Sequence, residues 1–351
     1  MYKLFIFILG VMISLVALAE TAVQVKHHKL QSKALADNRI QLDPLRNITV
    51  YLPPGYNKQT KHYPVIYYIP FNALDDSKVV PFLELAFQEK PDREFILVTG
   101  DFTLPGSLNF FGNNSVSGHW LDHIRQEIVP FIDKHYRTIP QAASRGISGH
   151  FLGGYAAIRL AMFHPDIFGS VYALHPVGTD VGERSMLYVP DWNEIHKAKS
   201  MSDLKAPYTV PFVAMAQAYL PNINHPPFYA DFIVESIDGK LTPNPANIRK
   251  LTRNFYLANL IPDLAENLHQ LRGIKFDWGR EDVNQAHVYS ARRFSLLLRD
   301  FGVEHDAEEY NGNGWDENFD KYGRLYQEML PFFDRYIFNA ESHLEKSSSI
   351  P

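Results

Sequence analysis

The chain has 351 residues, of which 46% are hydrophobic and 21% are charged, and its formal net charge is −5. This composition is that of a globular protein with enough apolar residues for a large core. The mild negative charge argues against nucleic-acid binding, for which a basic patch or stripe is typical. The chain has no cysteine, which excludes disulfides, thiol nucleophiles and cysteine-bound metals.

The first residues have the pattern of a secretory signal peptide. Lys3 precedes an apolar run, Leu4–Val16, and Ala17-Leu18-Ala19 is an A-x-A cleavage site. The alternative is an N-terminal membrane anchor, but the run is short for a span, which needs about 20 apolar residues. We therefore expect a signal peptide at residues 1–19, export to the periplasm or the medium, and no stable membrane span after cleavage.

Strand-like and helical patterns alternate along the rest of the chain. Short apolar runs rich in β-branched and aromatic residues are typical of strands buried on both faces, and apolar residues at helical spacing indicate helices. We predict strands at Asn47–Tyr56, Tyr63–Phe71, Glu94–Asp101, Arg145–His150, Gly169–Pro176, Ile274–Gly279 and Glu304–Tyr310. We predict helices at Trp120–Tyr136 (broken or kinked near Pro130), Leu152–Pro165, Asn284–Gly302 and Phe319–Phe338.

This alternation predicts an α/β fold with a mostly parallel sheet and helices on both faces. A region rich in proline, methionine and aromatic residues, from about Val177 to Arg272, interrupts it. We interpret this region (177–272) as a lid insertion over the carboxyl ends of the strands, where pockets of such sheets lie; the alternative is an ordinary helical excursion. The predicted domain covers residues 20–340, and a polar tail follows at 341–351.

One turn has the frame of a nucleophile elbow without its serine. Such an elbow is a strand, a sharp turn with the pattern G-x-S-x-G, and a helix, and it exposes the serine above the sheet. Gly149-His150-Phe151-Leu152-Gly153 matches every element of this frame except the serine, which Phe151 replaces.

The chain resembles the esterase D family of α/β-hydrolases, which includes S-formylglutathione hydrolases, mycolyltransferases and feruloyl esterases. The resemblance covers nearly the whole mature chain. It is carried by "VYLPPGY", "YPVIYYI", "NNSVSGHWLDHIRQEIVPFIDKHYRT", "SRGISGHFLGGYAAIRLAMFHPDIFGSVYALHP", "FDWGREDVNQ" and "EEYNGNG". It implies the α/β-hydrolase fold and a Ser-His-Asp triad for ester hydrolysis, with no cofactor and no metal.

The resemblance also shows which triad positions have changed. Asp282, in "WGRED", stands at the position of the family's acid, whereas Phe151 replaces the nucleophile and Gly314, in "YNGNG", replaces the base histidine. Without that histidine Asp282 needs another partner, and Arg280 is a near candidate. A histidine restored at position 314, together with Phe151→Ser, is expected to rebuild the triad.

The oxyanion hole and the pocket can be placed in the same way. Leu152 and Phe71 stand at the two oxyanion positions, but Pro70-Phe71 replaces the family's His-Gly, and proline has no N–H to donate. The resemblance further implies pocket positions at Asn114, Ser115 and Trp120, beside His150 at the elbow and the lid aromatics Tyr219, Phe228 and Tyr229.

These observations leave three functions open. The first is an exported pseudoenzyme that binds a small ester-like or apolar ligand, or a partner. The second is an active carboxylic-ester hydrolase with a non-standard nucleophile, for which Ser148 is a poor candidate because it lies inside a strand. The third is a non-catalytic scaffold whose cleft Phe151 fills. The fifteen histidines have no metal-ligand spacing, and the sequence does not define an oligomeric state.

We predict that the exported protein begins at Glu20, because Ala19 ends the cleavage pattern. Intact-mass measurement of protein from the periplasm or the medium checks this, and a mass that includes residues 1–19 would contradict it.

Overall fold

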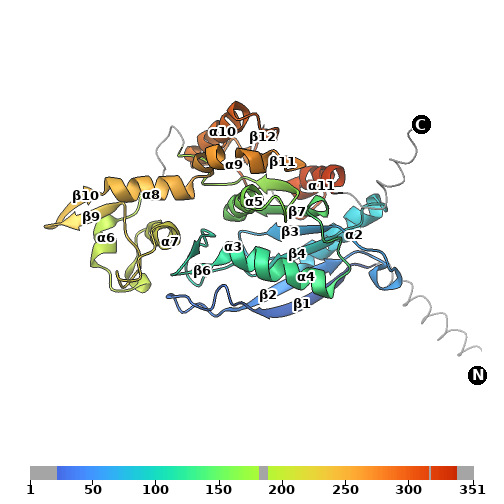
Figure 1. The fold of residues 1–351 in the computed structure, drawn as a ribbon, viewed down its shortest axis with the longest axis horizontal. Coiled ribbons are helices and arrows are strands. Elements are labelled where there is room, and N and C mark those ends of the chain that lie inside the picture. The colour runs from blue at the N-terminus through green and yellow to red at the C-terminus, as the bar shows by residue number, and fades with distance from the viewer. Residues whose placement is uncertain (1–21, 182–188, 316–317, 338–351) are drawn as a thin grey trace, which may run out of the picture.

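The computed structural model describes residues 22–181, 189–315 and 318–337 (Figure 1). The predicted signal peptide and the polar tail lie outside these residues. Within them, no helix combines the length and apolarity needed to cross a membrane.

An eight-stranded sheet with the order β1-β2-β4-β3-β7-β8-β11-β12 forms the centre of the fold. The strands from β4 to β12 pair in parallel, and β2 pairs antiparallel with both β1 and β4. Their bounds are β1 Gln24–Gln31, β2 Leu45–Leu52, β3 Val65–Ile69, β4 Ile96–Gly100, β7 Arg145–His150, β8 Ser170–Leu174, β11 Gly273–Gly279 and β12 Asp306–Tyr310. The predicted mostly parallel sheet is confirmed.

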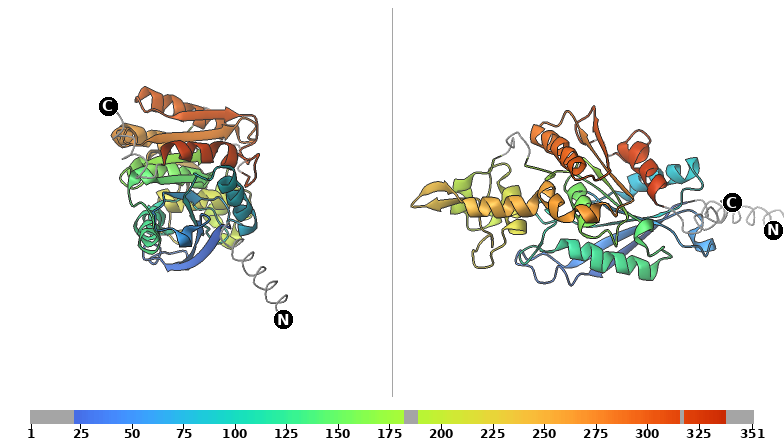
Figure 2. Two further views of the ribbon diagram at one scale, coloured as in Figure 1. Left: turned by 90° about the vertical axis from the view of Figure 1, so that its right-hand side faces the viewer. Right: turned by 45° about the horizontal axis from the view of Figure 1, so that its top comes forward.

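Helices cover both faces of this sheet, and each face has its own apolar core (Figures 1 and 2). One face packs against α2 (Asp76–Glu89) and α11 (Leu330–Tyr336). The other packs against α3 (Trp120–Asp122), α4 (Val129–His135), α5 (Leu152–Phe163), α9 (Ile261–Leu268) and α10 (Gln285–Asp300). Burial of both sheet faces explains why β3 and β8 are apolar runs without alternation and why every residue of β7 is buried.

The N-terminal strand β1 was not apparent from the sequence. His27 and His28 lie in this edge strand rather than in an unstructured polar segment, and β1 alternates between exposed and half-buried residues. An edge strand with one face towards solvent contains few apolar residues, so its composition resembles that of a loop.

The predicted kink at Pro130 takes a specific form. A π-helical segment, His123–Ile128, precedes the proline, and the helix then continues to His135. The N–H of Val129 donates to the carbonyl of Ile124, five residues back. A second π-helical segment, Leu325–Met329, precedes Pro331 at the start of α11 in the same way. Proline cannot donate to a carbonyl four residues back, and the wider turn accommodates its ring.

The chain between β8 and β11 contains the predicted lid region. Its elements are α6 Trp192–Lys197, α7 Thr209–Tyr219, the hairpin β9 Val234–Ile237 with β10 Lys240–Pro243, α8 Pro245–Phe255 and α9. The part from α6 to α8 forms an arm that extends beyond the sheet, whereas α9 packs against α5 (Figure 1; Figure 2, right). The arm leaves the fold at the carboxyl ends of the strands, so it lies next to the elbow.

Candidate functional site

The elbow keeps its backbone conformation although it carries no serine. Phe151 lies between the end of β7 and the start of α5 with φ 56° and ψ −114°. A bulky residue adopts a positive φ only where the surrounding structure enforces it. Its N–H donates to the carbonyl of Leu174 at the end of β8, 3.0 Å away. The predicted elbow geometry is therefore present, with a phenyl ring at the nucleophile position.

Two glycines make this turn possible. A Cβ atom at Gly153 would lie 2.0 Å from the carbonyl oxygen of Ile69 in β3, and one at Gly149 would lie 2.5 Å from the carbonyl group of Gly153. Neither approach is compatible with a side chain. The close packing of α5 against β3 and β7, rather than the residue at 151, therefore sets the backbone of the elbow.

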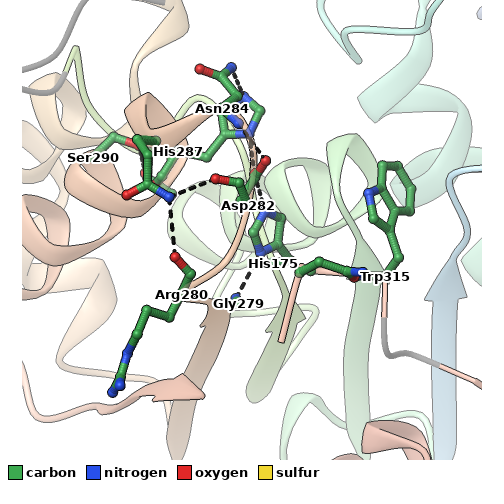
Figure 3. Close-up of polar contacts among 12 residues, drawn as sticks. His175, Gly279, Arg280, Asp282, Asn284, His287, Ser290 and Trp315 are labelled. Carbon is green, nitrogen blue, oxygen red and sulfur yellow. Dashed lines mark hydrogen bonds and ion pairs between the residues drawn. The ribbon is translucent and has the colours of Figure 1, made fainter. Parts of the chain in front are cut away.

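The Asp282 carboxylate has two histidine partners. The Nε2–H group of His175 and the Nδ1–H group of His287 each donate to Oδ2 at 2.8 Å, and the backbone N–H of Asn284 donates to Oδ1 at 2.8 Å (Figure 3). Burial alone would raise the pKa of Asp282, but the hydrogen bonds from His175 and His287 hold it well below its usual range. The carboxylate is thus charged and satisfied.

The prediction that Arg280 is the partner of the Asp282 carboxylate was wrong. Arg280 points away from Asp282, and its Nε–H group donates to Glu309 in β12 at 3.1 Å (Figure 3). Adjacency in sequence was misleading because the chain turns sharply after β11, which directs the two side chains to different sides. The true partners are His287, five residues further along the chain at the start of α10, and His175, which follows β8 and is brought to Asp282 by the fold.

His175 occupies the space of a side chain at position 314. A Cβ atom at Gly314 would lie 2.5 Å from both Cε1 and Nδ1 of His175, and Gly314 has φ 88°. Gly314 is therefore required by both its backbone conformation and its packing. The expectation that a histidine at 314 would complete a triad with Asp282 is wrong, since the imidazole of His175 already fills that space.

The hydrogen bonds of His175 define its tautomer. The backbone N–H of Gly279 donates to Nδ1 at 3.0 Å, so the ring proton lies on Nε2 and faces Asp282 (Figure 3). His175, Asp282 and His287 place one potential ligand atom each within 4.8 Å of one another, as in a metal site. A metal ligand must present an unprotonated nitrogen. The N–H of Gly279 prevents this at Nε2 of His175, so these residues fit an internal hydrogen-bond network better than a metal.

An aromatic cluster surrounds Phe151. Its ring stacks on Trp315 at a centroid distance of 5.2 Å and meets Phe71 edge-on at 5.1 Å and His287 edge-on at 5.5 Å. His150 is buried, and its Nε2–H group donates to the carbonyl of Gly314 at 2.7 Å. Burial lowers the pKa of His150 to about 3, so this imidazole is neutral. His150 therefore anchors the loop that presents Trp315.

One of the two backbone N–H donors expected for an oxyanion hole can be recognised in the structure. Leu152 is the first residue of α5, and the first N–H groups of a helix have no acceptor within the helix. Pro70 follows β3 without an N–H group, and the ring of Phe71 packs on Phe151. The site thus retains the helix-derived donor, while the second donor segment has become part of the aromatic cluster.

An open apolar pocket of about 190 Å³ lies beside Phe151. Its walls come from the elbow, the loop after β4, the segment after β8, the lid and the start of α10. They include Leu108, Phe110, Phe151, Leu152, Val177, Asp180, Phe212, Met215, Phe255, Tyr256, Asn284, Ala286, His287 and Ser290. The cleft is therefore not filled by Phe151, which forms one of its walls.

Four residues predicted at the pocket do not line it, and one of them, His150, is buried against the carbonyl of Gly314. Asn114 is buried, and its side chain bonds to Gly112 and Ser117 within its own turn. Ser115 is exposed, and Trp120 is fully buried with its indole N–H bonded to the carbonyl of Ser117. This motif builds a turn and a core contact rather than a pocket wall, which corrects the prediction.

The predicted lid aromatics also differ from those at the pocket. Tyr219 is buried and bonds to Tyr155 and to the carbonyl of Phe110, and Phe228 belongs to a small core inside the arm. Tyr229 is not among the lining residues. The lid instead contributes Phe212 and Met215 from the first half of α7 and Phe255 from the end of α8.

Neither of the two serines near the elbow is arranged as a nucleophile. Ser148 is fully buried within β7, in agreement with its predicted inward orientation, and its Oγ has no hydrogen-bond partner among the described residues. Ser290 lines the pocket, but its Oγ donates to the carbonyl of His287 and accepts from Thr179. Neither hydroxyl bonds to an imidazole nitrogen, as an activated serine would.

A parallel sheet covered by helices on both faces, with a nucleophile elbow at its carboxyl edge, defines an α/β-hydrolase. The model of a family described as "Putative esterase" matches residues 98–210, which include the elbow. Together with the fold, this match agrees with the resemblance to the esterase D family over the part of the chain that contains the elbow.

One curated relative is similar to part of the chain. The uncharacterized protein YbbA of Bacillus subtilis (strain 168) is 26% identical over 139 residues, a match that covers 36% of this chain and 54% of YbbA. The chain thus spans about half the length of that curated relative.

Solved structures share the fold over most of the chain. A ferulic acid esterase superposes with a TM-score of 0.59 and 19% identity, covering 90% of this chain and 99% of the esterase. An S-formylglutathione hydrolase from Agrobacterium tumefaciens has a TM-score of 0.56 and 14% identity, covering 91% and 97% of the two chains. At these identities the likeness establishes the fold.

We predict that Asp282→Asn destabilises the protein by about 2 kcal/mol at neutral pH, because two imidazoles lose a charged acceptor. The folded pKa of Asp282 lies below its unfolded value of about 3.9, so its contribution is present above that pH and decreases as the pH falls below it. Urea unfolding of both proteins across this range checks the prediction.

The exposed residue Asp37 gives a matched control. Asp37→Asn should leave the free energy of unfolding nearly unchanged at every pH. An Asp282→Asn effect that persists undiminished well below about pH 4 would contradict the assignment.

Proposed function

We propose that this protein is an exported member of the esterase-like α/β-hydrolases that has lost hydrolysis by a Ser-His-Asp triad and binds a small ester-like or apolar ligand in the pocket beside the elbow. The observation that carries the proposal is Phe151, which adopts the backbone conformation of a nucleophile and forms a wall of an open pocket.

The geometry supports a loss of serine-dependent hydrolysis. The elbow carries no nucleophile, the space of the base at position 314 holds His175, and His175 directs a protonated nitrogen to Asp282. Removing triad members leaves at most about 10³–10⁴-fold acceleration over water. Pro70 has no N–H group to donate, and an oxyanion hole that lacks one donor loses about 3 kcal/mol of transition-state stabilisation.

The pocket supports ligand binding rather than a purely structural role. Its walls are mainly apolar, and a few polar groups, His287 and Asn284 among them, reach its surface. That combination is typical of sites for small ligands. A volume of about 190 Å³ exceeds the roughly 150 Å³ of a cavity that binds benzene. A substituted aromatic ring or a short acyl chain fits this space, in keeping with the aromatic acid named for the ferulic acid esterase.

We predict that purified protein is not labelled by a fluorophosphonate probe and hydrolyses p-nitrophenyl butyrate no faster than a heat-inactivated control, since neither serine beside the elbow bonds to an imidazole. Ser148→Ala should change neither result. Turnover that survives this substitution would contradict the proposed loss of activity, and turnover abolished by it would identify a relocated nucleophile.

We predict that phenyl butyrate binds in the pocket and that Met215→Trp weakens its binding about tenfold or more, which corresponds to about 1.4 kcal/mol, because the indole fills the space beside Phe151. Isothermal titration calorimetry measures this affinity. Ile248→Trp, on the exposed side of α8, is the matched control and should bind like the unmodified protein. Equal affinity in all three proteins, or no binding to any, would argue against this pocket as a ligand site.

A further inference from the structure

We propose that His287, held by Asp282, is a poised general base in this pocket and replaces the missing histidine at position 314. The site would then lack a nucleophile but not a base, and a serine at position 151 alone would make it reactive towards carboxylic esters with an apolar acyl group. This inference rests on the proposed function only in taking Phe151 as the residue that prevents serine chemistry.

The orientation of the His287 ring is the first support. Its Nδ1–H group donates to Asp282 Oδ2 at 2.8 Å, and its Nε2 accepts from the Asn284 side-chain amide at 2.9 Å (Figure 3). In a Ser-His-Asp triad the histidine likewise directs Nδ1–H to the carboxylate and keeps Nε2 unprotonated to accept the serine proton. Asp282 is thus placed to stabilise the imidazolium that proton uptake would form.

The other histidine on this carboxylate lacks these properties. His175 bonds to Asp282 through Nε2, and its Nδ1 accepts from the N–H of Gly279. Its acceptor nitrogen is held by a backbone N–H group, whereas that of His287 is held by a side-chain amide, and His175 is 2% exposed. His175 therefore positions the carboxylate, while His287 is the histidine that reaches the pocket surface.

The distance to position 151 is the second support. The ring of His287 meets the ring of Phe151 edge-on, with 5.5 Å between centroids. A serine Oγ at this position would lie near the present Cγ atom, and removal of the phenyl ring would open the space between Oγ and His287. A direct hydrogen bond or one bridging water can span such a gap. The Asn284 amide, which lines the same pocket, must release Nε2 in this step.

The reaction of a Phe151→Ser variant with a fluorophosphonate follows from this geometry. The serine Oγ forms a bond to phosphorus, the phosphorus–fluorine bond breaks, fluoride leaves, and the serine proton moves to Nε2 of His287. With an ester, Oγ bonds to the carbonyl carbon, the ester C–O bond breaks, and the serine proton passes through His287 to the leaving alcohol oxygen. Water then cleaves the acyl–serine bond, which releases the acid and returns a proton to the serine.

The test compares labelling rates of Phe151→Ser with those of Phe151→Ser/His287→Ala. The first variant should become labelled at the introduced serine, and the second should react at least about 10²-fold more slowly, the usual contribution of a general base. Phe151→Ser/His305→Ala is the matched control, because His305 bonds to Ser295 and the carbonyl of Val303, away from the pocket. It should react like the single variant, and circular dichroism should show that all variants are folded.

A second measurement needs no substitution at the elbow. Long-range nitrogen–proton NMR spectra of the unmodified protein should show the ring proton of His287 on Nδ1 and that of His175 on Nε2, with the His287 signals identified by their loss in His287→Ala. A ring proton on Nε2 of His287 would overturn the inference. Equal labelling with and without His287, or a folded Phe151→Ser variant that never reacts, would also overturn it. Labelling of the unmodified protein would instead refute the proposed function.

Discussion

One buried carboxylate organises the site. Asp282 accepts hydrogen bonds from an imidazole after β8, from an imidazole at the start of α10 and from the backbone of Asn284, so two distant parts of the chain meet at its two oxygens. A buried carboxylate is stable only when its acceptors are satisfied. The place of His175, the rotation of His287 and the need for a glycine at 314 all follow from this requirement.

The backbone conformation of the elbow does not depend on which side chain stands at position 151. Its positive φ is enforced by the contact of Gly153 with β3 and of Gly149 with the first turn of α5, none of which involves the side chain at 151. The fold can therefore hold this turn with a residue other than serine at position 151. The phenyl ring then gains its own packing against Phe71 and Trp315, and the site becomes an aromatic wall.

Much of the fold could be predicted from the sequence because buried parallel strands and amphipathic helices have distinct patterns. The edge strand β1 could not, since its alternating exposure leaves little apolar signal. The elbow and Asp282 were found by motif. His175 was missed because it lies 107 residues from Asp282, although a histidine directly after a buried strand, in "ALHP", stands at the edge where such sites form. Asn114 and Trp120 were wrongly predicted to lie at the pocket, because the motif that they share with the family can stabilise a turn instead of a pocket wall.

Trp315, in the loop after β12, is more exposed than the other tryptophans of the chain. Of the four tryptophans, Trp120 and Trp278 are buried, Trp192 is half-buried in the arm, and Trp315 is 47% exposed and stacked on Phe151. An aqueous quencher such as iodide therefore reaches Trp315 preferentially, and the emission that it removes originates from the residue stacked on Phe151, which forms a wall of the pocket. The protein thus contains a natural fluorophore that is separated from the pocket by a single aromatic ring.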